Sequence, residues 1–393
     1  MFKLLYNIRI VLEYWKAILS YLLFDIKLIN SSFFNERIFN FSKLDRLKIN
    51  IYIYTLAHIV KLWNKKHYRS VTYSHDMENN LKNVYFPNTG ISIKYIMFSR
   101  FVYVNFILFV YPLICFFTSL YQGNFVNLLL FPNNWFFYWR LNSHLMYWHW
   151  FLTNSKSYSI EDKYSFLDLG KKNNIPITPY LKIKNIFIKH RNIEGGMGIY
   201  NFKNATVGGD WIIQERLTNG NFIKSLVGED APLSTFRVIT SSDKKVTKAS
   251  SGVVVLSCVF RAGRASNLTD HNAIFYNVDI INGKLGKGVI NSEWYNKNDN
   301  LENLDYHPDT NVKISGKKVP NFNAILNNCV LAHYKLAPDI PLIGWDVALV
   351  GRKSNVYILE CNLSCNFFMG ELDKKKYFKL IEKYYHFLEL YQF

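Results

Sequence analysis

Hydrophobic residues recur with a helical period at the start of the chain. Leu5, Ile8, Leu12, Trp15 and Leu19 are spaced three or four residues apart, which predicts an amphipathic helix. Charged residues interrupt this stretch, so a secretory signal peptide is not expected. The apolar side of the helix would either pack on the rest of the protein or lie on an anionic membrane, since basic residues flank it. The sequence leaves both alternatives open.

The stretch 101–139 contains no Lys, Arg, Asp or Glu, and it is long enough to cross a bilayer. A single crossing would place residues 1–100, which carry 15 basic and 6 acidic residues, outside the cytosol, against the positive-inside rule. We therefore favour a hairpin that enters one leaflet and bends near Pro112. A buried pair of helices in a soluble fold is the alternative.

From about residue 151 the pattern becomes that of a mixed α and β domain. Runs of β-branched and aromatic residues predict strands at 183–190, 210–217, 235–242, 253–263, 340–350 and 355–362. Helical periodicity predicts helices at 161–171, 322–338 and 371–390, and Asn282-Gly283 predicts a hairpin turn. We thus expect a helical, basic and aromatic-rich region at 1–150 and an α+β domain at 151–393.

Composition adds the charge of the chain to this picture. The 393 residues carry a net charge of +18, and 49% are hydrophobic, which excludes a largely disordered chain. Five scattered cysteines exclude a disulfide scaffold. Residues 1–150 contribute +10, from 16 Lys and Arg against 6 Asp and Glu. Nucleic acid, an anionic membrane surface and anionic substrates are all compatible partners, but no zinc-finger, recognition-helix or RNP pattern accompanies the charge.

Three oxygen-bearing side chains lie on the last two predicted strands. Asp346 is in the middle of one apolar strand, and Glu360 and Asn362 end the next. Side chains two residues apart project from the same face of a strand, so the set suits one or two Mg²⁺ ions. The alternative for each acid is an ion pair with a nearby Lys or Arg. Cys361 would face the other way and pack in the core.

A second candidate site is the turn after the strand at 183–190. Lys189 ends that strand, and Gly195, Gly196 and Gly198 follow it. A lysine at a strand end can neutralise a phosphate, and a glycine-rich turn can fold its N–H groups over the same anion. An ordinary hairpin with a surface lysine has the same pattern.

Taken together, these segments resemble the ATP-grasp enzymes, and within them the sugar-transfer-associated branch related to α-L-glutamate ligases. The most specific part is IGWDVALVGRKSNVYILECN, which resembles the GWD strand and the Glu-x-Asn metal strand of that branch. The resemblance covers about residues 155–390 and extends to the segments EDKYSFLDLGKKNNIPITP, IFIKHRNIEGGMG, IIQERL, STFRVIT, VFRAGRASNLTDHN and HPDTNVKISGKKVPNF. It implies an α+β fold in which two subdomains clasp a nucleotide.

The resemblance also implies roles for individual residues. Those that would hold the phosphates and adenine of ATP are Lys163, Lys189, Gly195, Gly196, Gly198, Gln214, Glu215 and Leu217. Those with a catalytic role would be Lys189, Arg237 and Arg261, of which the two arginines would stabilise the transferring phosphoryl group or a substrate carboxylate. Those that would bind Mg²⁺ are Asp346, Glu360 and Asn362.

The activity implied is the ATP- and Mg²⁺-dependent joining of a carboxylate to an amine through an acyl phosphate. We expect small-molecule or glycan-linked substrates, as in the modification of a surface polysaccharide or glycoconjugate. We also expect a cytoplasmic location, at the inner face of the membrane if residues 1–150 contact it. The alternatives are a degenerate member that binds nucleotide without ligation and a basic nucleic-acid-binding protein.

This chain departs from the branch in three segments. Asp270-His271-Asn272 lacks the Gly-Gly pair that usually follows, Asn311 stands where a glycine usually follows HPDT, and 363–365 replaces a turn that contains proline. The first departure changes the acceptor loop, so the resemblance does not identify the substrate.

Overall fold

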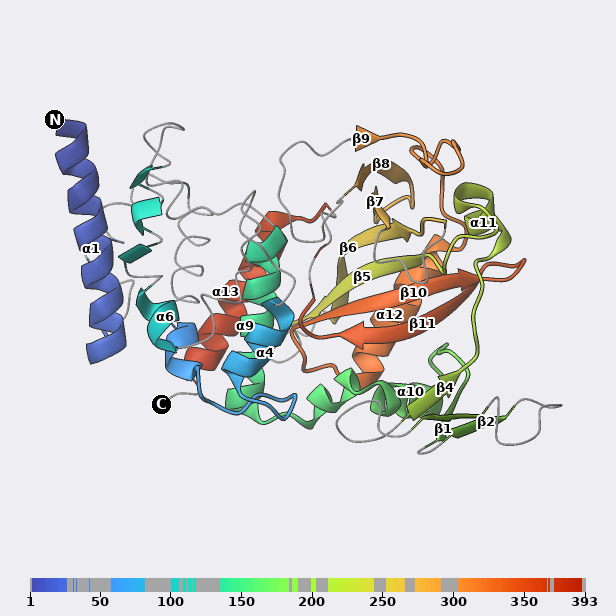
Figure 1. Cartoon of the computed structure of the whole chain (residues 1–393), viewed down its shortest axis with the longest axis horizontal. Helices are drawn as coiled ribbons and strands as arrows, with labels where there is room; N and C mark the ends of the chain where they lie inside the picture. The colour runs from blue at the N-terminus through green and yellow to red at the C-terminus, as the bar shows by residue number, and fades with distance from the viewer. Residues whose placement is uncertain are drawn as a thin grey trace.

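The computed structural model of the chain has a β-sheet with helices beside it (Figure 1). The residues that it describes are 2–26, 31, 33, 42, 58–81, 100–105, 109–110, 112–114, 116–117, 135–183, 186–189, 199–202, 211–243, 252–265, 273–290, 303–365, 367 and 371–390. The helices are α1 (Phe2–Phe24), α4 (Tyr73–Leu81), α6 (Arg100–Asn105), α9 (Trp135–Thr153), the 3₁₀ helix η3 (Lys156–Glu161), α10 (Lys163–Lys172), α11 (Asn221–Val227), α12 (Phe322–Leu336) and α13 (Lys374–Leu390). The strands are β1 (Tyr180–Ile183), β2 (Ile186–Lys189), β3 (Ile199–Phe202), β4 (Trp211–Gln214), β5 (Thr235–Ser242), β6 (Val253–Ala262), β7 (Ile274–Val278), β8 (Leu285–Ile290), β9 (Asn303–Leu304), β10 (Leu342–Val350) and β11 (Asn355–Asn362).

A seven-stranded antiparallel sheet forms the centre of the structure, in the order β11-β10-β5-β6-β7-β8-β9. β10 pairs with β11 on one side and with β5 on the other. Every residue of β5 is buried, and so is all of β10 except its last residue. The strands predicted at 235–242, 253–263, 340–350 and 355–362 and the helices predicted at 161–171, 322–338 and 371–390 are therefore confirmed.

Two small antiparallel sheets lie beside the large one, β1 with β4 and β2 with β3. β2 and β4 confirm the strands predicted at 183–190 and 210–217. Figure 1 shows both small sheets next to α10. The glycine-rich turn that follows β2 lies outside the described residues.

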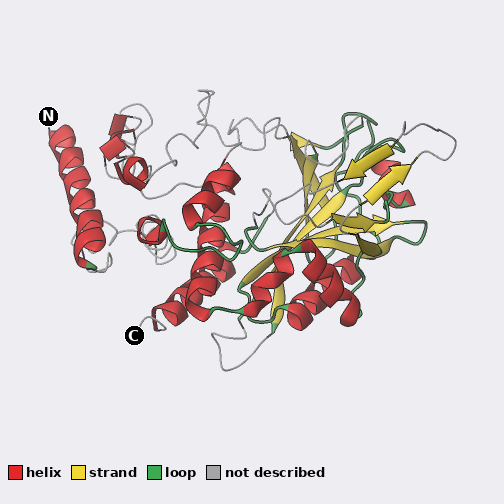
Figure 2. Ribbon diagram, turned by 60° about the horizontal axis from the view of Figure 1, so that its bottom comes forward, coloured by secondary structure: helices red, strands yellow, loops and turns green. Residues whose placement is uncertain are grey.

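Helices pack against one face of the large sheet, as Figure 2 shows. α12 contacts β5, β6, β10 and β11, and α10 contacts β11. On this face the Trp345 indole packs near Phe166 of α10 and donates a hydrogen bond to Thr240 Oγ1 at 2.8 Å. This face of the sheet is therefore joined to the helices by packing and by a buried hydrogen bond.

The hydrogen bond from Trp345 continues into α12 through Thr240. His333 Nε2 lies 2.9 Å from the carbonyl oxygen of Ile340, so Nε2 carries the proton and Nδ1 accepts. The Thr240 hydroxyl then donates to His333 Nδ1 at 2.7 Å. Burial lowers the pKa of His333 to about 4, which keeps the ring neutral near pH 7. The side-chain polar atoms of Trp345, Thr240 and His333 thus all have hydrogen-bond partners.

The left-handed backbone conformation occurs at two turns that bear on the sequence predictions. Gly283 has a φ of 73°, and a Cβ there would come within 2.9 Å of the Phe322 ring, so the hairpin predicted at Asn282-Gly283 is confirmed. Asn311 has a φ of 52°, a conformation that asparagine tolerates better than most residues. This chain therefore keeps the turn after HPDT without the glycine that usually stands there.

α1 confirms the helix predicted at the start of the chain, but of its predicted apolar stripe only Trp15 packs on the core, where it is partly buried. Leu5, Ile8, Leu12 and Leu19 are exposed, the first at 57%. The residues that pack inward form a second apolar stripe on the opposite side: Ile10, Val11, Tyr14, Ala17, Ile18 and Tyr21. Both sides of α1 are thus apolar.

Among the residues that the structure describes, no helix has the length and apolar character needed to cross a membrane. Residues 118–134, which include most of the second arm of the predicted leaflet hairpin, lie outside the described ranges. The hairpin therefore stays a prediction.

α9 links the N-terminal part of the chain to the sheet. It passes through residue 150, where the sequence predicts a domain boundary, and it packs against α13. The rings of Trp148 in α9 and Tyr385 in α13 have centroids 5.1 Å apart. Buried apolar residues from α1, α9, the sheet and α13 belong to one continuous cluster. The division at residue 150 stays a prediction, and it lies across a shared core.

The hydrogen bonds of Thr240 can be tested by substitution. We expect Thr240→Val to lower the free energy of unfolding by about 1–3 kcal/mol, because Trp345 Nε1 and His333 Nδ1 would lose a partner inside the core. Thr178→Val is the matched control: Thr178 is also buried, and its Oγ1 has no hydrogen-bond partner in the described part of the chain. Urea denaturation measures both, and equal losses would contradict the hydrogen-bond chain.

Candidate functional site

The other face of the sheet carries charged side chains from four neighbouring strands. Because side chains alternate along a strand, Asp346 of β10 points to this face and Trp345 points to the helices. Asp346 lies opposite Arg237 of β5 and opposite Glu360 of β11 in the strand register. The sheet order thus brings together two residues that are 109 positions apart in the chain, Arg237 and Asp346.

Asp346 makes ion pairs with two arginines. Arg237 donates from Nε to Oδ1 at 2.5 Å and from Nη2 to Oδ2 at 3.0 Å, and Arg261 Nη1 donates to Oδ2 at 3.4 Å. All three residues are buried. Burial alone would raise the pKa of the Asp346 carboxyl, but the charges of Arg237 and Arg261 lower it below its ordinary value. Asp346 is therefore ionised, which metal binding requires.

Glu360 and Asn362 lie beside Asp346, as the sequence predicts. Glu360 Oε2 is 3.0 Å from Nζ of Lys163, and Glu360 Oε1 is 3.5 Å from Nδ2 of Asn362. Lys163 is the first residue of α10, where Asp162 accepts a hydrogen bond from the Ser165 N–H at 2.8 Å as the N-cap. The Lys163 side chain is 70% exposed, so this ion pair contributes at most about 1 kcal/mol.

Asp346 and Glu360 therefore both make ion pairs, which is the alternative that the sequence left open. Their partners are Arg237, Arg261 and Lys163, and the resemblance implies a phosphate-binding or catalytic role for each of these three. The oxygens of Asp346, Glu360 and Asn362 are hard donors of the kind that Mg²⁺ prefers. Within the described ranges, no group of three or more His, Cys, Asp and Glu side chains could hold a metal. The three residues fit an ion that is bound together with phosphate oxygens, as Mg²⁺ commonly is.

Gly344 leaves room for the side chains of Arg237 and Cys365 beside this cluster. It lies on β10 opposite Asn362, two residues before Asp346. A Cβ at this position would be 2.7 Å from Cβ of Cys365 and 3.3 Å from Nη1 of Arg237. Gly344 belongs to the GWD segment of the resemblance, but no local sequence pattern indicates its close contact with Arg237.

A bulge in β11 directs Glu360 and Asn362 toward the cluster. Val347 pairs with Ile358 and Asp346 pairs with Glu360, so Leu359 is an extra residue in the ladder. Ile358 and Cys361 therefore both point to the core, where each is buried. The Cys361 thiol donates to the carbonyl oxygen of Ile160 at 2.9 Å, which agrees with the predicted packing role.

The predicted phosphate-binding turn is described only in part. Lys189 ends β2, and its backbone pairs with Ile199 of β3. Gly195, Gly196 and Gly198 lie outside the described residues. The phosphate roles of these four residues stay predictions.

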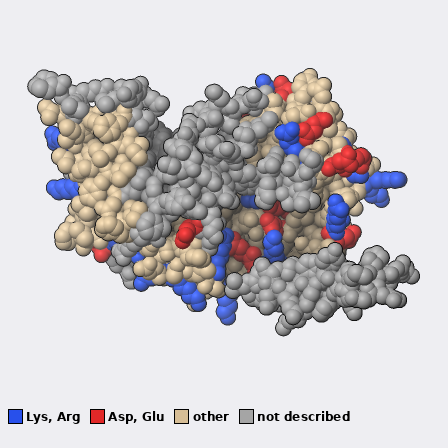
Figure 3. All heavy atoms as spheres, in the orientation of Figure 1, with Lys and Arg blue, Asp and Glu red and all other residues tan. Residues whose placement is uncertain are grey.

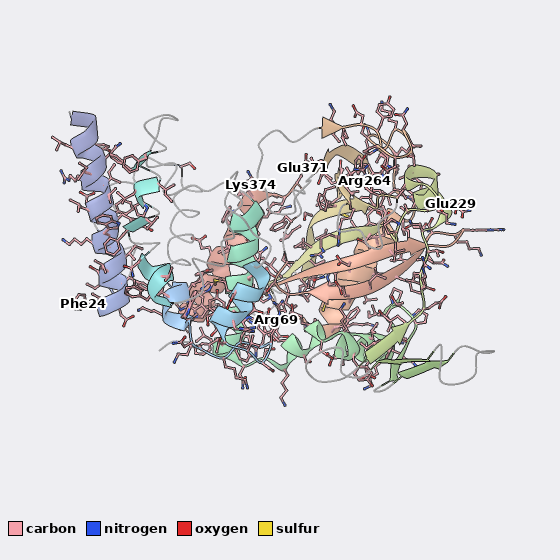
Figure 4. The ribbon with its side chains drawn as sticks, viewed as in Figure 1. Phe24, Arg69, Glu229, Arg264, Glu371 and Lys374 are labelled. Atoms are coloured by element: carbon pink, nitrogen blue, oxygen red, sulfur yellow. The ribbon has the colours of Figure 1, made fainter. Side chains whose placement is uncertain are left out.

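The segment that is implied to hold adenine follows β4. Gln214 ends the strand, and the Glu215 N–H donates to the carbonyl oxygen of Pro179 at 3.0 Å. A cavity of about 490 Å³ lies next to this segment, bounded by Leu217, by Lys224 of α11 and by residues 229–233; Figure 4 labels Glu229 at this edge of the molecule. Of the three predicted adenine residues only Leu217 lines the cavity, so the adenine site stays a prediction.

A further ion pair joins two of the segments that carry the resemblance. Arg264 Nη2 donates to Asp309 Oδ1 at 2.6 Å, and the Ala265 N–H donates to Asp309 Oδ2 at 3.0 Å. Figure 4 shows Arg264 beside β6 and β7. Acidic and basic side chains are interleaved on the face of the molecule in Figure 3. No local sequence pattern predicts this pair, because 45 residues separate Arg264 from Asp309.

The space at Gly344 gives a prediction for the cluster. We expect Gly344→Ala to destabilise the protein by about 1–3 kcal/mol, because the new methyl group would overlap Cys365 and press on Arg237. Gly286→Ala is the control, since the nearest atom to a Cβ there is 3.5 Å away. Thermal and urea denaturation measure both variants. A Gly344→Ala protein as stable as the control would show that the strand has room to spare.

Comparison with known proteins supports the resemblance over much of the chain. Residues 181–376 match the family described as sugar-transfer associated ATP-grasp. This range contains the GWD strand, the Glu-x-Asn strand and both arginines of the cluster, and Lys163 precedes it. No curated protein matches the chain.

Solved structures of ATP-grasp ligases and related enzymes are similar to the chain at low identity. The ATP-grasp ligase PsnB, complexed with its minimal precursor, is 13% identical with a TM-score of 0.30, and the match covers 68% of this chain and 75% of PsnB. The N5-carboxyaminoimidazole ribonucleotide synthetase from Thermotoga maritima is 12% identical with a TM-score of 0.26, over 52% of this chain and 42% of that enzyme. The chain thus spans less than half the length of the Thermotoga enzyme. Through residues 181–376, the chain belongs to the sugar-transfer-associated ATP-grasp family and has its α+β fold.

Proposed function

We propose that this protein is an ATP- and Mg²⁺-dependent ligase that joins a carboxylate to an amine. The observation that carries the proposal is the cluster on one face of the sheet, where Asp346, Glu360 and Asn362 lie beside Arg237 and Arg261. A triphosphate with its metal ion needs both kinds of group, because the phosphate oxygens attract cations and the metal ion attracts carboxylates. Membership of the ATP-grasp family supports ATP as the phosphoryl donor.

Each residue of the cluster would have one task. Asp346, Glu360 and Asn362 would hold Mg²⁺, which when bound offsets the negative charge of the phosphates. Arg237 and Arg261 would donate hydrogen bonds to the phosphoryl group during its transfer. Since both arginines already contact Asp346, their guanidinium groups are held in place before a nucleotide binds.

The nucleotide would be held by residues on both sides of the cluster. Lys163 is mostly exposed and pairs with Glu360, so its Nζ can move to a phosphate oxygen at small cost. Lys189 and the turn at 195–198 would close over the phosphates and exclude water. The segment 214–217 would hold adenine through backbone groups.

The reaction would take place in two transfers. A carboxylate oxygen attacks the γ-phosphorus of ATP while the bond to the ADP oxygen breaks, which gives an acyl phosphate and ADP. The amine nitrogen then attacks the acyl carbon, phosphate leaves with the bonding electrons, and the nitrogen loses a proton. The products are an amide, ADP and phosphate. Water would hydrolyse the acyl phosphate, so its exclusion decides the yield of amide.

We further propose that one substrate is part of a glycan or of a glycoconjugate precursor and that the reaction is cytoplasmic. The description of the matching family, sugar-transfer associated, supports a sugar-linked substrate. A chain that binds nucleotide without ligation is the main competing function, and nucleic-acid binding is the other.

The ligase proposal is tested by ADP release. Purified full-length protein is mixed with Mg-ATP and a panel of carboxylates, amines and glycan precursors, and ADP is measured by a coupled assay. We expect Glu360→Gln to lower acceptor-dependent ADP release about tenfold or more, because Mg²⁺ would lose a charged ligand. Glu13→Gln, on the surface helix α1, is the control and should keep the activity of the wild type.

The competing functions give different results in the same assay. Binding of ATP without ADP release above the Glu360→Gln level, across the whole panel, would favour a protein that only binds nucleotide. Absence of ATP binding together with a salt-sensitive gel shift on random DNA would instead favour a nucleic-acid-binding protein.

We also propose that the outer face of α1 binds an anionic lipid surface. Leu12 and Leu19 on this face are exposed, and Phe24 ends the helix with 71% exposure; Figure 4 shows Phe24 at the edge of the molecule away from the sheet. Arg9 and Lys16 border the same face and are also exposed. An apolar face bordered by basic groups suits the boundary between acyl chains and anionic headgroups.

Vesicle sedimentation tests the lipid surface. We expect the wild type to bind vesicles that contain phosphatidylglycerol and not vesicles of phosphatidylcholine alone. The double variant Leu12→Glu/Leu19→Glu should bind at least about tenfold more weakly, because it removes two exposed leucines that would enter the lipid surface. Ile281→Glu, which changes an 89% exposed residue of the sheet domain, is the control. Equal binding of both variants, or a dimer by light scattering that the double variant abolishes, would argue against a lipid partner.

A further inference from the structure

The backbone that follows the predicted magnesium ligand Asn362 is held by residues that precede the sheet. Asn362 is the last residue of β11 that pairs with β10, so the ladder does not fix what comes after it. Each of the next three residues instead has a partner outside the sheet. The contacts are Leu363 N–H to Glu161 Oε1 at 3.3 Å, Ser364 Oγ with Tyr68 OH at 3.3 Å, and Asn142 Nδ2 to the Cys365 carbonyl oxygen at 2.9 Å.

Glu161 is itself held by an arginine of the N-terminal region. Arg69 donates from Nε to Glu161 Oε2 at 2.9 Å and from Nη2 to Oε1 at 2.5 Å. The third nitrogen of Arg69 donates to Asp76 Oδ1 at 2.9 Å. The carboxylates of Glu161 and Asp76 are at most 16% exposed. A two-pronged pair of this kind fixes orientation as well as distance.

Asn142 ties the same segment to two helices. Its side chain is fully buried on α9, and its Oδ1 accepts a hydrogen bond from the Tyr377 hydroxyl of α13 at 2.6 Å. Figure 4 shows Arg69 beside α4, at the end of the sheet that faces the N-terminal helices. Contacts from α9 and from the segment around Arg69 thus meet at residues 363–365.

We propose that Arg69 and Glu161 position Asn362 and Glu360 for magnesium, so that the N-terminal region is a working part of the site. The inference rests on the proposed function, because it assigns those two residues to Mg²⁺. β11 is an edge strand, and the end of an edge strand frays unless something outside the ladder holds it. The Arg69–Glu161 pair holds the Leu363 N–H one residue beyond Asn362. Arg69 and Glu161 act through this backbone, so they are positioning residues.

The test measures Mg²⁺-dependent binding of ADP by calorimetry, with full-length protein and no turnover. We expect Arg69→Met and Glu161→Gln to raise the Mg²⁺ concentration for half-maximal ADP binding about tenfold. Loss of a residue that orients a metal ligand typically weakens metal binding by about 10–100-fold, and this expectation is at the lower end. ADP binding without Mg²⁺ should be unchanged. Arg9→Met is the matched control, since Arg9 also pairs with a glutamate, Glu13 at 2.8 Å, on the surface of α1.

Hydrogen exchange gives a second readout that needs no ligand. The Leu363 amide should exchange faster in Arg69→Met and Glu161→Gln than in the wild type, while amides in β5 stay protected. If Arg69→Met does not fold, Glu161→Gln, which keeps the shape of the side chain, decides by the same two measurements.

The outcomes separate this inference from the proposed function. A wild type that does not bind ADP with Mg²⁺ would overturn the proposed function. A wild type that binds, with unchanged Mg²⁺ midpoints in both variants, would overturn the positioning role alone. An equal shift in Arg9→Met would also overturn it, because the effect would then be a general loss of stability.

Discussion

The burial of the Asp346 carboxylate is the constraint on which the arrangement of the sheet depends. An ionised group in the middle of a strand loses its hydration, and only well-placed opposite charges offset that loss. Arg237 and Arg261 supply them from β5 and β6, which fits the sheet order, with β5 next to β10 and β6 next to β5. Buried ion pairs are often no more stabilising than apolar residues of the same volume. Stability alone therefore does not account for the cluster, which supports our proposal that it binds a charged ligand.

Stability comes from the opposite face of the same strand. The alternation of side chains divides the GWD segment: Gly344 and Asp346 belong to the charged cluster, and Trp345 belongs to the core with Thr240 and His333. The core does not stop at the sheet, because apolar residues of α9 and α13 continue it into the N-terminal helices. Substitutions in the core and in the cluster should therefore be separable in their effects, although they lie on neighbouring residues.

The sequence was sufficient for what depends on local patterns. Strand alternation placed Glu360 and Asn362 on one face, and the helical period identified α1, α12 and α13. It could not say which stripe of α1 packs inward, because both sides of that helix are apolar. Nor could it pair Arg237 with Asp346, or Arg69 with Glu161, since these contacts follow from strand order and helix packing over 109 and 92 residues.

The bulge at Leu359 has a consequence for how this chain can change over evolutionary time. Upstream of it, Ile358 faces the core, and three residues later Cys361 faces the core again, an odd interval that only the extra residue allows. Replacing Leu359 by another residue of similar size would leave this phase intact. Deleting it would turn Glu360 and Asn362 toward the helices and Cys361 toward the arginines, since a one-residue slip reverses every side chain that follows. This strand should thus tolerate substitutions at Leu359 but not insertions or deletions.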